Sequence, residues 1–122
     1  MNLNLDEYPI IDQARVNDLI SLSTDGAALL YQLKAMFLTS TPGKILSIKS
    51  GLEKNDYVTV RNEAHVLKST AANLGAKRLS RILDLIEHTS PDQLKPNHEK
   101  ILQTLDSEFN TICDIFRKDT GL

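Results

Sequence analysis

The sequence has one cysteine, few helix-breaking residues and no long apolar run. Cys113 has neither a disulfide partner nor a second thiol at metal-ligand spacing, which predicts a reducing compartment and a small apolar role on a helix. The first seven residues include two acids and no basic residue, so they do not resemble a secretory signal. Because no stretch approaches the roughly 18 apolar residues of a membrane span, we expect a cytoplasmic protein.

An excess of basic charge is also absent. The chain has 14 Lys and Arg against 16 Asp and Glu, a net charge of −2, and its basic residues are spread along the sequence, which argues against a nucleic-acid partner. Hydrophobic residues make up 41% and charged residues 25%, as in ordinary soluble globular proteins. The length of 122 residues predicts one domain, over residues 1–122, with a single core.

Apolar residues in the N-terminal half recur at intervals of three and four, which is typical of amphipathic helices. Asp12 can cap a short helix over about residues 12–21. Residues 23–25 offer a cap for a second helix, which should run to about residue 40. Thr41-Pro42 then either starts a new helix or kinks the previous one, and the sequence does not choose between these alternatives.

The C-terminal half continues the same pattern. Asn55-Asp56 predicts a helix start, and Gly75 is a natural C-terminal cap for that helix. The next helix must end before Pro91, and residues 90–97 form the one obvious loop before a last helix. The helix that ends at Gly75 carries a clean apolar stripe of Val60, Ala64, Leu67, Ala71 and Leu74.

Four long helices, each with one apolar stripe and short connections, can bury those stripes only by packing around a shared axis. We therefore expect an all-α fold, an antiparallel four-helix bundle over about residues 25–118 with the short N-terminal helix over one end. A bundle does not specify a function, so functional residues must be sought among exposed side chains that break the pattern.

One such residue is His65. On a helical wheel it lies about 140° from the centre of the apolar stripe, on the solvent side. Lys68, Ser69 and Ala72 follow it on the same face or its margins, and Arg61 lies one turn before it. An imidazole that is unprotonated near pH 7 is a nucleophile, and a nearby ammonium would stabilise negative charge that arrives on it. This combination suits a phosphoryl group.

The residues around His65 form the string AHVLKSTAANLGA over 64–76, followed by Leu79, Ile82, Leu83, Ile86 and Glu87. This string resembles that of the histidine-containing phosphotransfer (HPt) domain. Further residues agree with the family pattern, so that the resemblance covers most of the chain: Pro9-Ile10-Ile11-Asp12, Phe37-Leu38, Thr41-Pro42, Leu52 and Asn55-Asp56.

The resemblance implies a phosphorelay carrier rather than an enzyme. His65 would accept a phosphoryl group on its outer ring nitrogen from the aspartyl phosphate of one receiver domain and pass it to another, while Lys68 would neutralise the transferred group. The receiver would supply the aspartate and Mg²⁺, so no cofactor and no autokinase activity are expected of this chain. The implied partners are receivers of hybrid histidine kinases and of response regulators, docking on a monomer at Arg61, Ser69 and Ala72.

One position departs from the family pattern, which usually has Gly directly after the lysine, where this chain has Ser69. A glycine would let a partner approach the imidazole closely, so Ser69 puts the ease of docking in doubt rather than the chemistry. The Ser69 hydroxyl could equally donate a hydrogen bond to a phosphoryl oxygen. The sequence leaves both interpretations open.

Two other functions compete with this hypothesis. A helical module that binds receivers without accepting phosphate would have no need of His65 or Lys68. A histidine kinase dimerisation fragment usually has Glu directly after the histidine and a Pro in the same helix, whereas here Val66 follows and no Pro lies between Pro42 and Pro91. The initiating methionine favours a free-standing protein over the excised end of a larger kinase.

The remaining polar candidates are interpreted as ordinary surface residues. His88 and His98 lie near helix ends and have no acid or thiol at ligand spacing in a recognisable motif, so no metal site is predicted. The acids on the predicted helix surfaces are interpreted as isolated and solvated rather than as acid-base catalysts: Glu53, Glu63, Asp84 and Glu87.

Overall fold

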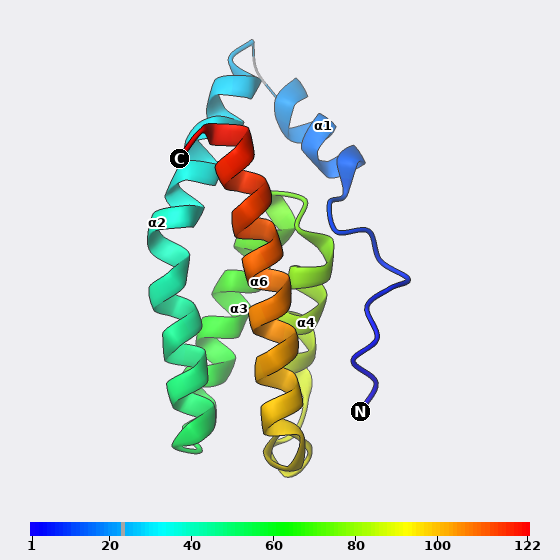
Figure 1. The fold of residues 1–122 in the computed structure, drawn as a ribbon, viewed down its shortest axis with the longest axis vertical. Helices are drawn as coiled ribbons and strands as arrows, with labels where there is room; N and C mark the ends of the chain where they lie inside the picture. The colour runs from blue at the N-terminus through cyan, green and yellow to red at the C-terminus, as the bar shows by residue number, and fades with distance from the viewer. Residues whose placement is uncertain (23) are drawn as a thin grey trace.

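The computed structural model describes residues 1–22 and 24–122, and its long helices pack side by side as a bundle (Figure 1). The bundle helices are α2 (Gly26–Glu53), α3 (Tyr57–Asn73), α4 (Lys77–His88) and α6 (His98–Thr120), and α1 (Gln13–Ser21) lies at one end. The expected fold class, an all-α antiparallel four-helix bundle with a short additional N-terminal helix, is confirmed. None of the described helices is long and apolar enough to span a membrane.

The helices α1 and α3 begin at the predicted aspartates. Asp12 Oδ1 accepts a hydrogen bond from the backbone N–H of Arg15 at 3.2 Å, and Asp56 Oδ1 accepts one from Thr59 at 3.3 Å. These bonds satisfy N–H groups that have no partner inside the helix. The side chains that the sequence marks as helix starts therefore do cap these two helices.

Helix α2 is longer than predicted, because it continues unbroken through Pro42 to Glu53. The expected end near residue 40 is wrong. Of the two alternatives at Thr41-Pro42, a new helix does not start there, because Pro42 lies inside α2. Proline removes one backbone hydrogen bond, but the residues on both sides of it form one stripe that is buried in the core: Phe37, Thr41, Ile45, Ile48 and Leu52. Asp25 stands at the N-cap without a side-chain hydrogen bond, and Ser23 lies outside the described residues.

Within the predicted loop over residues 90–97, residues 91–97 are helical. They form the short helix α5 (Pro91–Leu94) and a 3₁₀ turn (Lys95–Asn97). Proline suits the first position of a helix because its φ is already set. The N–H of Leu94 donates to the Ser90 carbonyl at 2.9 Å, and the Leu94 side chain is fully buried. Burial of this one leucine gives the connection a fixed place against the bundle.

The predicted stripe of α3 lies in the core, where Val60, Ala64, Leu67 and Ala71 are each 0% exposed. Because a helix presents opposite faces to opposite sides, the face that carries His65 must then point to solvent. The His65 side chain is accordingly 62% exposed, as the helical wheel predicts.

The tight turn between α3 and α4 is made at Gly75, whose φ is +76°. A Cβ at this position would lie 2.9 Å from the carbonyl oxygen of Asp12, so glycine is needed both for the backbone angle and for the close approach of the N-terminal segment. That segment is held to the turn by hydrogen bonds from Asp12 N–H to the Gly75 carbonyl, 2.7 Å, and from Lys77 N–H to the Ile10 carbonyl, 3.2 Å. As a result, residues before α1 run alongside α4 (Figure 1).

Candidate functional site

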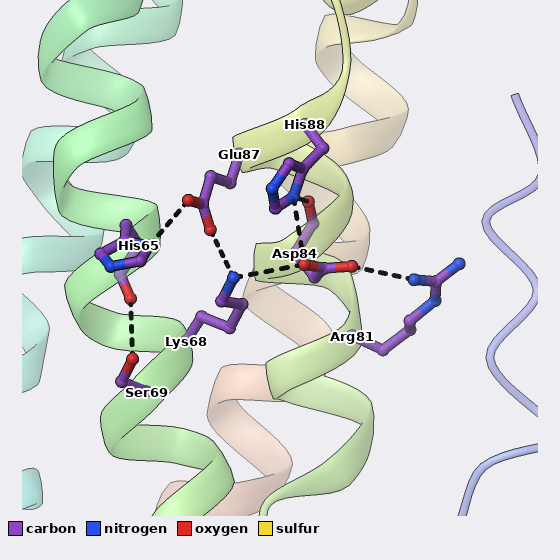
Figure 2. A network of polar contacts seen from close by, with 7 residues as sticks. All are labelled: His65, Lys68, Ser69, Arg81, Asp84, Glu87 and His88. Atoms are coloured by element: carbon purple, nitrogen blue, oxygen red, sulfur yellow. Dashed lines mark hydrogen bonds and ion pairs between the residues drawn. The ribbon is translucent and has the colours of Figure 1, made fainter.

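His65 points from α3 toward α4, where its Nδ1 lies 2.7 Å from Oε2 of Glu87 (Figure 2). An ionised carboxylate can only accept, so Nδ1 carries the proton in this hydrogen bond. In the neutral imidazole the other nitrogen, Nε2, then has the free lone pair. The contact with Glu87 therefore selects the tautomer in which Nε2 has the lone pair of an exposed ring.

Lys68 reaches from α3 to the same carboxylate. Its Nζ lies 2.6 Å from Glu87 Oε1 and 3.3 Å from Asp84 Oδ1, and its side chain is only 23% exposed. Oε1 of Glu87 is shielded from solvent and depends on this ammonium for its stabilisation. Glu87 thus holds the imidazole with one oxygen and the ammonium with the other (Figure 2).

The contacts shift two pKa values in directions that keep the pair charged. The hydrogen bond to Glu87 raises the pKa of Lys68, although desolvation opposes the effect. The hydrogen bond from Lys68 lowers the pKa of Glu87, with a further contribution from His65. Both shifts favour the ionised forms, so the carboxylate remains an acceptor for Nδ1 at neutral pH.

The interpretation of Asp84 and Glu87 as isolated surface acids is wrong. Asp84 contacts three cationic or imidazole groups, since it also lies 3.0 Å from Arg81 Nη1 and 3.1 Å from His88 Nδ1. The two acids are far from His65 in sequence and come from another helix, so periodicity within α3 cannot reveal them. The sequence nevertheless contains a signal that could have found these acids. His65 and Lys68 are three residues apart on one helix, and Asp84 and Glu87 are three residues apart on the next, so the two pairs can face each other across neighbouring helices.

The statement that His88 has no acid at ligand spacing is also wrong. One ligand atom each from Asp84, Glu87 and His88 lies within 4.8 Å of the others. The two carboxylates already face Lys68 and Arg81, which neutralise the charge that would attract a cation. We therefore assign no metal to this cluster. His98, at the start of α6, is half-buried, and its Nε2 has no hydrogen-bond partner among the described residues.

The three residues predicted at a docking surface, Arg61, Ser69 and Ala72, are all exposed on the His65 side of α3. Ser69 Oγ donates to the His65 carbonyl at 3.3 Å, so the hydroxyl is engaged by its own helix (Figure 2). Two hollows flank this part of α3. One lies toward α2 and has mostly apolar walls, and the other lies toward α4 and contains Lys68 and Ser69.

Comparison with known proteins assigns this arrangement to a family. The sequence model of the Hpt domain matches residues 32–114, which is more than half of the chain. No curated protein matches the sequence. The crystal structure of histidine-containing phosphotransfer protein B (HptB) from Pseudomonas aeruginosa PAO1 is similar, with a TM-score of 0.78 over 93% of this chain and 96% of that chain. At 17% identity this likeness shows a shared fold.

The bridging carboxylate leads to a prediction about the tautomer of His65. Glu87→Ala removes the acceptor of Nδ1–H, whereas Glu87→Gln keeps an amide oxygen that can accept it. We expect the ¹⁵N NMR signals of the ring to shift toward the Nε2–H form in the alanine variant and to stay near wild type in the glutamine variant. Phosphoryl acceptance should slow by roughly tenfold in the alanine variant and less in the glutamine variant.

Glu99→Ala, on the exposed surface of α6, is the matched control and should change neither signal. If the Glu87→Ala ring keeps the wild-type tautomer, Glu87 does not orient the histidine.

Proposed function

This chain belongs to the Hpt family of histidine phosphotransfer carriers, and we propose that it accepts a phosphoryl group from a receiver-domain aspartyl phosphate onto His65 and passes it to another receiver. The observation that carries the proposal is the hydrogen bond between His65 Nδ1 and Glu87 on an otherwise exposed ring. It leaves Nε2 unprotonated and accessible, which is what a nucleophile in this reaction requires. The match to the Hpt domain over residues 32–114 supports the same assignment.

The transfer step follows from this geometry. The lone pair of Nε2 forms an N–P bond while the P–O bond to the receiver's aspartate breaks, and the electrons of that bond leave with the carboxylate. The ring gains positive charge, which the Glu87 carboxylate stabilises through Nδ1–H. Lys68, held at the same carboxylate, stabilises the negative charge of the phosphoryl oxygens. The receiver would supply Mg²⁺, and in-line positioning would account for most of the rate.

The hollow between α1, α2 and α3 offers the receiver a place to dock. It has a volume of about 520 Å³, and its walls include Leu19, Leu33, Met36 and Leu74. Met36 is 62% exposed, so burying it would give a partner apolar contact area. Thr70 and Asn73 also line the hollow, one and two turns beyond His65 on α3. A receiver seated here would cover the imidazole with an interface of about 1,200 Å² or less, which allows release after each transfer.

His65→Gln tests the proposal. The variant should accept no label from a receiver domain carrying radioactive aspartyl phosphate, while wild type acquires an acid-labile, base-stable label. Its melting curve should match wild type, since a substitution at an exposed position usually changes stability by less than about 0.5 kcal/mol.

His88→Gln and His98→Gln are controls and should both accept label. A labelled His65→Gln protein would assign the phosphohistidine elsewhere, and an unlabelled wild type that still binds receivers would favour an interaction module without phosphate transfer.

Lys68→Ala should slow transfer without abolishing it, because the ammonium stabilises charge but forms no bond to phosphorus. The expected loss is roughly ten- to hundredfold, which is the usual scale of a charge-assisted contact. Lys118→Ala, on the exposed end of α6, is the control for removal of a lysine. Equal single-turnover rates for Lys68→Ala and wild type would reduce Lys68 to a structural partner of Glu87.

Ser69 is small enough to be tolerated at the interface, and its hydroxyl already donates to the His65 carbonyl. We predict that Ser69→Gly transfers as fast as wild type or faster, with a slightly lower melting temperature, because Gly destabilises a helix interior by about 0.5–1 kcal/mol. Ser69→Arg should lose transfer and keep its fold, since a displacement of about 1 Å already slows in-line reactions steeply. A Ser69→Gly variant clearly slower than wild type would show that the hydroxyl contacts the phosphoryl group.

A further inference from the structure

A second hollow lies on the other side of the His65 helix, between α3, α4 and the N-terminal segment. Its volume is about 390 Å³, and its walls include Lys68 and Ser69 from α3, Lys77, Arg81 and Asp84 from α4, and Tyr8. Because Lys68 also contacts the carboxylate that binds His65, the hollow adjoins the proposed transfer site. A partner that covers His65 would therefore also cover this opening.

The cations around the hollow differ in whether a carboxylate neutralises them. Lys68, Lys77 and Arg81 line it together with one carboxylate, Asp84. Lys68 is also paired with Glu87, at 2.6 Å. Asp84 is shared between Lys68 and Arg81. Lys77 makes no ion pair with any residue that the structure describes. Among the residues that the structure describes, Lys77 is thus the one cation of the hollow without a carboxylate partner.

Lys77 lies at a position in its helix that is unfavourable for a positive charge. It is the first residue of α4, and the first turn of this helix has no acidic residue. The helix dipole disfavours a cation at that end. The neighbouring Arg78 has a structural use, since its Nε donates to the Tyr8 carbonyl at 2.6 Å. The side chain of Lys77 makes no hydrogen bond or ion pair with the part of the chain that the structure describes, so its charge is available to a partner.

The N-terminal segment gives the hollow its outer wall. The Tyr8 carbonyl is bound by Arg78, and the Arg81 guanidinium lies 5.8 Å from the centre of the Tyr8 ring. Tyr8 lies before the stretch that matches the Hpt domain, which begins at residue 32. The hollow is therefore built partly from a residue that lies outside the matched stretch.

We propose that this hollow binds an acidic side chain, Asp or Glu, of the receiver docked on His65, and that Lys77 thereby selects among receivers. The proposal rests on the function proposed above. A carboxylate is the complement of these cations, and the volume accommodates one acidic side chain with water around it. Lys77 comes from α4 and takes no part in the contacts of His65, Lys68 and Glu87, so its contact affects docking rather than the chemical step.

The test is charge reversal at Lys77. Lys77→Glu should raise the receiver concentration that gives half-maximal transfer by about tenfold while the maximal rate changes by less than about twofold. The variant should fold at least as well as wild type, because a glutamate in the first turn of a helix interacts favourably with the dipole. Lys100→Glu, exposed on α6, reverses a charge elsewhere and should leave both parameters unchanged.

A second experiment identifies the acidic residue of the receiver that contacts Lys77. Each exposed Asp and Glu around the receiver's phosphorylated aspartate is replaced by Lys in turn. With one of these receiver variants, the receiver concentration that gives half-maximal transfer to Lys77→Glu should return to near the wild-type value. An unchanged half-maximal concentration in Lys77→Glu, an equal effect of Lys100→Glu, or the lack of any restoring receiver variant would each overturn the proposal.

Calorimetry with unphosphorylated receiver separates this inference from the function on which it rests. If wild type accepts no label yet binds a receiver about tenfold more tightly than Lys77→Glu does, the transfer function fails and the acidic contact stands. If Lys77 is needed only for binding inorganic phosphate, and receiver affinity is the same in both proteins, the hollow is a site for a free anion and the proposal is wrong.

Discussion

Burial of the α3 stripe is the constraint on which the rest of the site depends. Val60, Ala64, Leu67 and Ala71 have no exposed surface. The helix cannot rotate without bringing polar groups into the core. The opposite face, with His65 and Ser69, is therefore held toward solvent by residues that are themselves buried.

The way in which α4 is aligned beside α3 gives the exposed His65 its polar neighbours. The turn at Gly75 is so short that α4 runs back directly beside α3, and this brings Glu87 to the level of His65. A single carboxylate then orients the imidazole and pairs with the ammonium that would meet the phosphoryl group. The same turn also receives the N-terminal segment, through hydrogen bonds of Gly75 and Lys77 to residues just before α1.

The proposed chemistry and the proposed partner recognition use partly different regions of the molecule. The residues that orient and charge the imidazole lie between α3 and α4, within the stretch that matches the Hpt domain. The two hollows proposed for docking also use α1, α2 and the N-terminal segment, parts of which lie before that stretch, together with residues of α3 and α4 inside it. This arrangement would let docking contacts change while the reacting groups stay fixed.

Much of this protein was determined by local sequence. Periodicity and capping residues predicted α1, α3, α4 and α6, and the wheel of α3 placed His65 on the solvent side, because these features depend on neighbours within a few turns. Only the tertiary structure decided that α2 continues through Pro42 and that Leu94 organises residues 90–97, because burial against other helices outweighs the local signals there. It also decided the partners of His65 and Lys68, since Glu87 and Asp84 reach them from another helix across a distance that no periodicity within α3 encodes.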